Sequence, residues 1–232
     1  MKVINNVIAI ALSALAMTSC MVNTRELSGR IISESTNRVA LSEETPAFNT
    51  IKIKGAVDVT YVVSDKSEYK AEIPEDLKDY FEIKVNENGV LEIGLDTKKF
   101  IVWKGSSATI TAYGPQLYGV ELSGSGDFYA EKISLVGEFS AKINGSGDIE
   151  IGDLVSDKAG FEINGSGDIE VKKINTYDLN AEIHGSGDID IAGKTEGGRL
   201  AIYGAGDINV SKLEVAENLE TVIKGSGDIN RK

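Results

Sequence analysis

Residues 143–149 read INGSGDI, and the same seven letters return without change at 163–169. Gly-(Ser/Ala)-Gly-Asp followed by Phe or Ile occurs six times in the chain. The first glycines of the six copies are spaced by 21, 20, 20, 19 and 21 residues: Gly124, Gly145, Gly165, Gly185, Gly204 and Gly225. A fixed period near twenty residues indicates one small supersecondary unit stacked on itself, because each unit is too small to bury an apolar face alone.

Apolar columns flank every copy of this motif. The position two before the first glycine is Leu or Ile in all six units, and the position four after it is Phe or Ile. Two residues further out on either side the columns stay largely apolar, whereas the intervening residues are mostly polar or charged. Alternation with a period of two is typical of strands that bury one face. The motif therefore lies between two strands.

We interpret the motif as a structural corner. Glycine permits both a positive φ and a close approach of backbones, and the aspartate carboxylate can accept hydrogen bonds from nearby amides. Units stacked in parallel at about 4.8 Å would align like residues in ladders. The corner residues predicted in this way are Gly124, Gly126, Asp127, Gly145, Gly147, Asp148, Gly165, Gly167, Asp168, Gly185, Gly187, Asp188, Gly204, Gly206, Asp207, Gly225, Gly227 and Asp228.

The period also sets the shape of one coil. Nineteen to twenty-one residues fit three short strands and their corners, and a weaker apolar column nine residues after the glycine supplies the third side, although Lys194 breaks it. The sequence thus predicts an all-β protein whose residues 119–232 form a parallel β-solenoid. A right-handed coil is expected, because parallel crossovers strongly prefer that hand.

The N-terminal residues predict export and anchoring. An apolar stretch from Val7 to Met17 is too short to span a bilayer, and small residues precede Cys20, the only cysteine of the chain. This pattern resembles a signal peptide at 1–19 that is removed, followed by lipidation of Cys20. Several acyl chains on one cysteine give stable membrane anchoring, which predicts a cell-envelope protein at the outer membrane, facing the periplasm or the outside. Residues 20–46 are polar and are expected to form a flexible tether.

Residues 47–118 predict an irregular β region that caps the solenoid. Residues 51–61 fit the repeat template with Val57 in place of the second glycine, as a degenerate first coil would. Further strands are expected at 69–73, 81–85, 90–95 and 108–113, with a hairpin turn before Val90 and a helical turn at 74–77. A cap is needed because an open end of a solenoid exposes unpaired strand edges.

Segments 48–61, 89–93 and 115–127, together with the later repeats, resemble the family called putative auto-transporter adhesin, head GIN domain, a group of lipoproteins from Bacteroidetes-type bacteria. The resemblance covers residues 47–232. It implies a β-solenoid body on a secreted, often lipidated chain, and it brings no agreed catalytic residues. We therefore expect a non-catalytic binding, adhesion or scaffolding module for protein or carbohydrate.

Two other chemistries compete with this interpretation. Parallel β-helices host polysaccharide lyases and hydrolases, so a carbohydrate-active enzyme is the alternative function. The six aspartates, however, recur at one geometric position, as structural residues do, and the single histidine, His184, belongs to a polar outward column. Structural calcium is the second alternative, but calcium-binding β-roll repeats have a nine-residue period. We predict no catalytic residue, no metal site and no cofactor.

Charge and aromatic residues bear on the partners. The net charge of −12 and the lack of a basic patch argue against nucleic acid. The predicted partners are the membrane, through the anchor, and a protein or glycan ligand. Near the junction of the two regions, Trp103, Tyr113 and Tyr118 are a candidate platform for stacking on a ligand, with ordinary packing as the competing interpretation.

Overall fold

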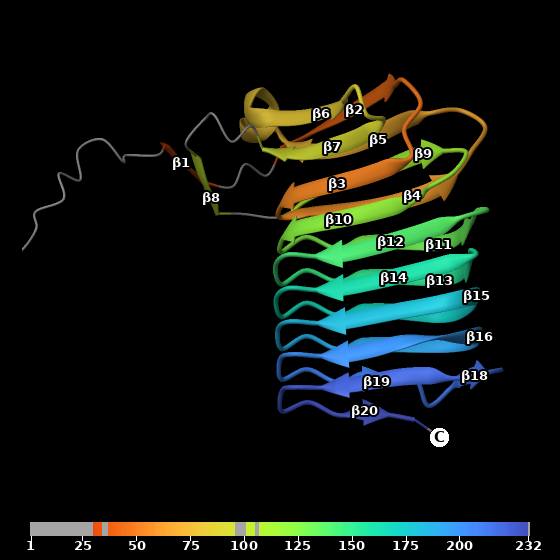
Figure 1. The fold of residues 1–232 in the computed structure, drawn as a ribbon. Coiled ribbons are helices and arrows are strands. Elements are labelled where there is room, and N and C mark those ends of the chain that lie inside the picture. Colours follow the sequence, from red (N-terminus) through yellow and green to blue (C-terminus); the bar gives the residue numbers. More distant parts are fainter. Residues whose placement is uncertain (1–29, 34–36, 96–100, 105–106, 232) are drawn as a thin grey trace, which may run out of the picture.

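Two stacks of parallel strands form the body of the protein (Figure 1). The computed structural model describes residues 30–33, 37–95, 101–104 and 107–231, and side chains are described in 37–95 and 107–231. The front stack contains, in spatial order, β7 (Val90–Leu95), β3 (Thr50–Gly55), β10 (Gly119–Gly124), β12 (Glu138–Ile143), β14 (Lys158–Ile163), the second halves of β15 (Ile169–Ile183) and β16 (Ile189–Ile202), and β19 (Leu219–Ile223).

The back stack is built from the strands that follow the glycine corners. It contains β9 (Ala108–Gly114), β4 (Val57–Val63), β11 (Phe128–Ser134), β13 (Ile149–Val155), the first halves of β15 and β16, then β17 (Ile208–Asn209) and β20 (Ile229–Asn230). β18 (Leu213–Val215) pairs with the middle of β16. The predicted parallel β-solenoid is thus confirmed.

Like residues lie in register from coil to coil. On the front stack Ile143 pairs with Ile163 and Ile163 with Ile183, while on the back stack Ile149 pairs with Ile169. These side chains are at most 1% exposed, so the two columns flanking the corners form one continuous apolar core. Each buried isoleucine contributes about 1.5–3 kcal/mol, which explains how so narrow a body is stable.

Each coil has a third, short side. In the coil of β13, buried residues alternate with residues outside the core except at two places. At Gly152-Asp153 and again at Asp157-Lys158, two successive residues lie outside the core. Leu154 is buried between these two bends, as the column nine residues after the glycine predicts. Lys194 leaves that column because its unit is one residue shorter, so that Gly193 pairs with Ile174 in its place.

The N-terminal region continues both stacks. β3 and β4 form the predicted degenerate coil. In this coil Gly55 pairs with Gly124, and the backbone of Val57 stacks against Gly126 as the second glycine does in the other coils. This coil lies between the coil of β7 and β9 and that of β10 and β11, although β7 and β9 come later in the chain than β3.

Antiparallel strands close this end of the solenoid. β5 (Glu68–Pro74) pairs with β9, β6 (Phe81–Val85) pairs with β7, and a 3-10 helix, η1 (Glu75–Tyr80), begins at the expected place after Pro74. Because antiparallel partners occupy the outer edges of β7 and β9, another solenoid coil cannot pair there.

One part of the predicted tether differs from the expectation. β2 (Arg38–Glu44), within the segment 20–46, pairs antiparallel with β5, and Leu41 packs against the core. The outer edge of β5 offers unpaired backbone groups, and a short alternating segment is enough to satisfy them. Separately, β1 (Arg30–Ser33) pairs with β8 (Ile101–Lys104). The predicted signal peptide and Cys20 lie outside the described residues, and within the described part no helix is long and apolar enough to cross a membrane.

Candidate ligand-binding surface

The glycine corners stack directly on one another. A Cβ added to Gly165 would lie 1.9 Å from the carbonyl oxygen of Gly145, and one added to Gly167 would lie 2.0 Å from that of Gly147. Similar contacts recur through all six copies. No side chain can occupy such a space, since real Cβ atoms do not approach a backbone atom so closely.

Close approach, and not a positive φ, is the reason for most of these glycines. Of the twelve repeat glycines only Gly124 has a φ in the left-handed range, at 151°. The expectation that these corners need both properties is therefore wrong in its first part. The corner keeps an ordinary backbone conformation, and the stacking distance excludes every residue with a Cβ.

The aspartates form a hydrogen-bonded ladder along the corner. The Oδ1 atom of Asp168 accepts the backbone N–H of Asp188 at 2.7 Å, and Asp188 in turn accepts that of Asp207 at 2.7 Å. The same bond joins the other members in turn, beginning at Asp58 of the degenerate coil, and the members are Asp58, Asp127, Asp148, Asp168, Asp188, Asp207 and Asp228. Charge-assisted bonds of this kind offset the repulsion between neighbouring carboxylates.

We expect Asp188→Asn to change the free energy of unfolding by less than about 1 kcal/mol, because the amide oxygen still accepts the Asp207 N–H while one charge leaves a crowded column. Asp188→Ala removes the acceptor and should cost about 1 kcal/mol, since water reaches the exposed amide. Urea denaturation measures both.

The melting temperature of the wild type should also be the same in excess Ca²⁺ and in a chelator. In residues 37–95 and 107–231, no group of three or more His, Cys, Asp or Glu side chains is placed to hold a metal ion. A large drop of the melting temperature in chelator would show, through ligand-linked stability, that the ladder binds a cation.

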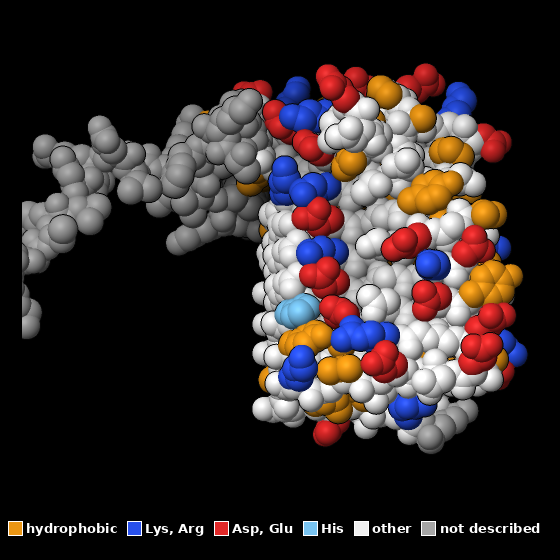
Figure 2. All heavy atoms as spheres, viewed as in Figure 1, with side chains coloured by type: hydrophobic (Ala, Val, Ile, Leu, Met, Phe, Trp, Pro, Cys, Tyr) orange, Lys and Arg blue, Asp and Glu red, His pale blue; other side chains and the backbone are white. Residues whose placement is uncertain are grey.

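A shallow groove runs down the front stack, across the strands. Figure 2 shows it as a pale band between two columns of charged side chains. Gly160 and Asn180 form its floor, Glu138, Lys158 and Asp178 line one side, and Arg199 lies at one end. Its volume is about 590 Å³. We call this feature the front groove. The floor is low because the column five residues before the glycine carries small side chains.

The charges beside the front groove are largely paired within the protein. Lys158 Nζ lies 3.9 Å from Asp178 Oδ2, and in the column on the other side Lys142 Nζ lies 2.8 Å from Glu162 Oε1. Burial alone would raise the pKa of Glu162, but hydrogen bonds from Lys142 and Asn164 hold that pKa below its ordinary value. The walls therefore present alternating, locally neutralised charges with many hydrogen-bonding atoms.

A stack of side chains borders the groove on the side of the glycine corners. The rings of His184 and Tyr203 are stacked, with centroids 4.8 Å apart and nearly parallel planes, at 5°, and Lys224 Nζ lies 5.5 Å from the centroid of the Tyr203 ring. Arg199 donates to the hydroxyl of Tyr203 at 2.9 Å and pairs with Glu182. His184 lies in the outward column where the sequence places it, beside Glu182 Oε2 at 3.4 Å.

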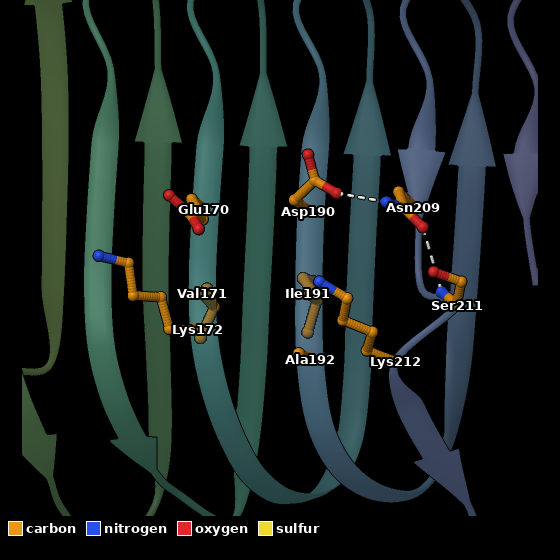
Figure 3. A pocket seen from close by; sticks show the side chains of 9 residues that line it. All are labelled: Glu170, Val171, Lys172, Asp190, Ile191, Ala192, Asn209, Ser211 and Lys212. Atoms are coloured by element: carbon orange, nitrogen blue, oxygen red, sulfur yellow. Dashed lines mark hydrogen bonds between the residues drawn. The ribbon is translucent and has the colours of Figure 1, made fainter.

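The back stack carries a smaller hollow, of about 410 Å³, drawn in Figure 3. Glu170, Asp190 and Asn209 follow one another along it, and Lys172 and Lys212 complete its rim. Its polar groups bond one another: Asn209 Nδ2 donates to Asp190 Oδ1 at 2.6 Å, and Lys172 forms an ion pair with Glu150 outside the hollow. The front groove is the larger of these two hollows, and its lining comes from four successive coils, against three for the back hollow.

The three aromatic residues of the predicted platform occupy different settings. Trp103 belongs to β8, which pairs with β1, and its side chain lies outside the described residues. Tyr113 is the second-last residue of β9 and has Lys70 Nζ 5.1 Å from its ring centroid, and the Tyr118 hydroxyl donates to Gln116 at 3.0 Å. In the described part no ring contact joins Tyr113 to Tyr118. The platform stays a prediction.

Sequence reasoning missed the residues of the front groove and Asp58. A signal for the groove exists in the column five residues before the glycine, which reads Gly, Ser, Gly and Asn before Arg199. Asp58 occupies the aspartate position of the degenerate coil at 51–61 and could have been found from that alignment.

Comparison with known proteins supports the fold independently. A crystal structure of a "putative lipid binding protein" from Parabacteroides distasonis ATCC 8503 superposes with a TM-score of 0.74 at 21% identity, over 88% of this chain and all of that chain. A "putative adhesin" from Bacteroides fragilis NCTC 9343 superposes with a TM-score of 0.67 at 20% identity, over 87% of this chain and all of that chain. At such identities the likeness establishes the fold alone.

A search of proteins with curated functions finds no match to the sequence. A family model described as "Putative auto-transporter adhesin, head GIN domain" matches residues 47–231, which include the degenerate coil, the antiparallel cap and all six glycine corners. The chain belongs to this adhesin-like family.

Proposed function

We propose that this protein is a cell-envelope lipoprotein, anchored through Cys20, whose solenoid is a non-catalytic binding and adhesion module for carbohydrate or protein. The front groove is its ligand surface. The anchor rests on the leader and on the small residues before Cys20, and the binding role agrees with the family to which the chain belongs.

The observation that carries the proposal is the continuity of the front groove across successive coils. Adjacent strands repeat at about 4.8 Å, so the groove offers similar polar contacts again and again along the solenoid axis. An extended ligand can match such a surface over its length. The paired charges on both sides favour a ligand that is neutral and rich in hydrogen-bonding groups, such as a neutral polysaccharide or an extended polar peptide.

Filling the floor of the groove tests this proposal. A Cβ at position 160 would meet only the carbonyl oxygen of Phe139, at 3.9 Å, so Gly160→Gln should fold normally while its side chain occupies the groove. Cells that carry the full chain are incubated with labelled glucan, mannan and xylan, and are separately allowed to settle on gelatin. We expect Gly160→Gln to lower the retention of any probe held by the wild type at least tenfold.

Lys132→Gln, an exposed position on the back strand β11, is the matched control and should bind like the wild type. Equal binding by the wild type and Gly160→Gln, or retention of no probe by the wild type, would contradict the assignment of the groove. The release of new reducing ends from the same polysaccharides would instead support the carbohydrate-active enzyme.

A further inference from the structure

The two ends of the solenoid differ. The end at β7 and β9 is covered by antiparallel strands and η1, whereas β19, the last front strand, pairs only with β16 among the described residues (Figure 1). Thr221 and Ile223 continue inward columns whose previous members, Leu200 and Ile202, are fully buried. Ile223 is nevertheless 49% exposed, because no described strand follows it.

The outer edge of β19 has backbone groups available for pairing. The carbonyl oxygen of Asn218 accepts from Gly198 at 3.0 Å, and the N–H of Lys224 donates to Ile202 at 2.8 Å. Alternate residues of a parallel strand bond the same neighbour, so the even-numbered positions of β19 face β16. The N–H and C=O groups of Thr221 and Ile223 therefore point away from the solenoid. The C=O of Leu219 points the same way, and it accepts a hydrogen bond from Arg231 Nη1 at 3.4 Å, so the free part of the edge is centred on Val222.

We propose that this edge binds the same edge of a second copy of the chain, with the two β19 strands antiparallel about a two-fold axis at Val222. In this register Thr221 lies opposite Ile223 of the second copy, and both have outward-facing backbone groups, as a hydrogen-bonded antiparallel pair requires. The same register places Glu220 opposite Lys224 of the second copy, and the symmetry creates this ion pair twice.

Charge and topology select this arrangement over its alternatives. An axis at Thr221 would place Glu220 opposite Val222 and Lys224 opposite Asn218, which leaves both charges without a partner of opposite sign. Parallel stacking of β19 on β7, as a further coil would stack, is blocked because the antiparallel strand β6 already occupies the outer edge of β7. An isologous contact also closes at two copies instead of growing into a fibre.

Cysteine cross-linking tests the register in the full chain. Val222→Cys would face itself across the axis as a non-hydrogen-bonded pair, where Cβ atoms are about 4.5–5.5 Å apart, close to the separation of a disulfide. Under mild oxidation we expect most of this variant to run as a dimer on a non-reducing gel. Ser140→Cys, an exposed position in the middle of the front stack, should stay monomeric.

Charge reversal tests the ion pairs without relying on a cysteine. With the full chain in detergent, we expect sedimentation to show a wild-type dimer that Glu220→Lys or Lys224→Glu weakens at least tenfold. The double variant, which exchanges the two charges, should regain the wild-type affinity to within about threefold. A monomeric wild type, cross-linking of Val222→Cys to a different protein, or a double variant as weak as the single ones would each overturn the proposal.

Discussion

Gly165→Val is expected to destabilise the protein by about 3 kcal/mol or more. The added Cβ would lie 1.9 Å from the carbonyl oxygen of Gly145, and that oxygen belongs to a corner that is itself stacked on Gly124. Neither corner can move without breaking the Asp168-to-Asp148 bond beside it. The strain must therefore be spread over several coils, which is among the few mechanisms that give large effects from one substitution. Chemical denaturation measures the difference.

Gly160→Val is the matched control, because it adds the same side chain to a front strand of the same coil where the space is open. It should change the free energy of unfolding by less than about 1 kcal/mol, toward greater stability, since valine suits a strand better than glycine does. A loss below about 0.5 kcal/mol for Gly165→Val would show that the corners relax and that the stacking distance does not require glycine.

Cys20→Ala is expected to abolish stable membrane association. Without the thiol there is no site for the acyl chains, and the protein should appear in the soluble fraction or accumulate as a precursor that keeps residues 1–19. Ser19→Ala keeps a small residue before the cysteine and should be processed and anchored like the wild type. Fractionation and gel mobility distinguish these outcomes. If Cys20→Ala fractionates and migrates as the wild type does, the proposed anchoring through Cys20 is wrong.

The repeat made most of the body predictable. Corners, the two flanking columns and the third side all follow from residues that recur every twenty positions, because a stacked geometry imposes the same requirement at each coil. Single features were harder to see. β2 is a short alternating segment in a polar stretch, and its partner β5 lies about thirty residues away, so no local pattern reveals the pairing.

The candidate site was less predictable than the fold, for a physical reason. A groove is made by small residues between larger ones, and Gly160 or Asn180 by itself looks like any residue of a solvated face. Only the register of the strands shows that these positions align below two charged columns. The aspartate ladder was easier to find, because the same residue at the same place in six repeats indicates a common role. Its hydrogen bonds link successive coils, so they can be seen only in the structure.

The position of the coil formed by β3 and β4 has a consequence for how the chain folds. Contacts between later coils join residues about one repeat apart, as Lys142 and Glu162 are at a separation of 20, whereas Lys52 contacts Glu121 across a separation of 69. Long loops cost more entropy to close, and low contact order favours rapid folding. We expect the regular coils to form first and to nucleate folding. The coil of β3 and β4 should form later, because it needs the coils on both of its sides. Because a chain is synthesised from its N-terminus, the first strands to be made would then be among the last to find their partners.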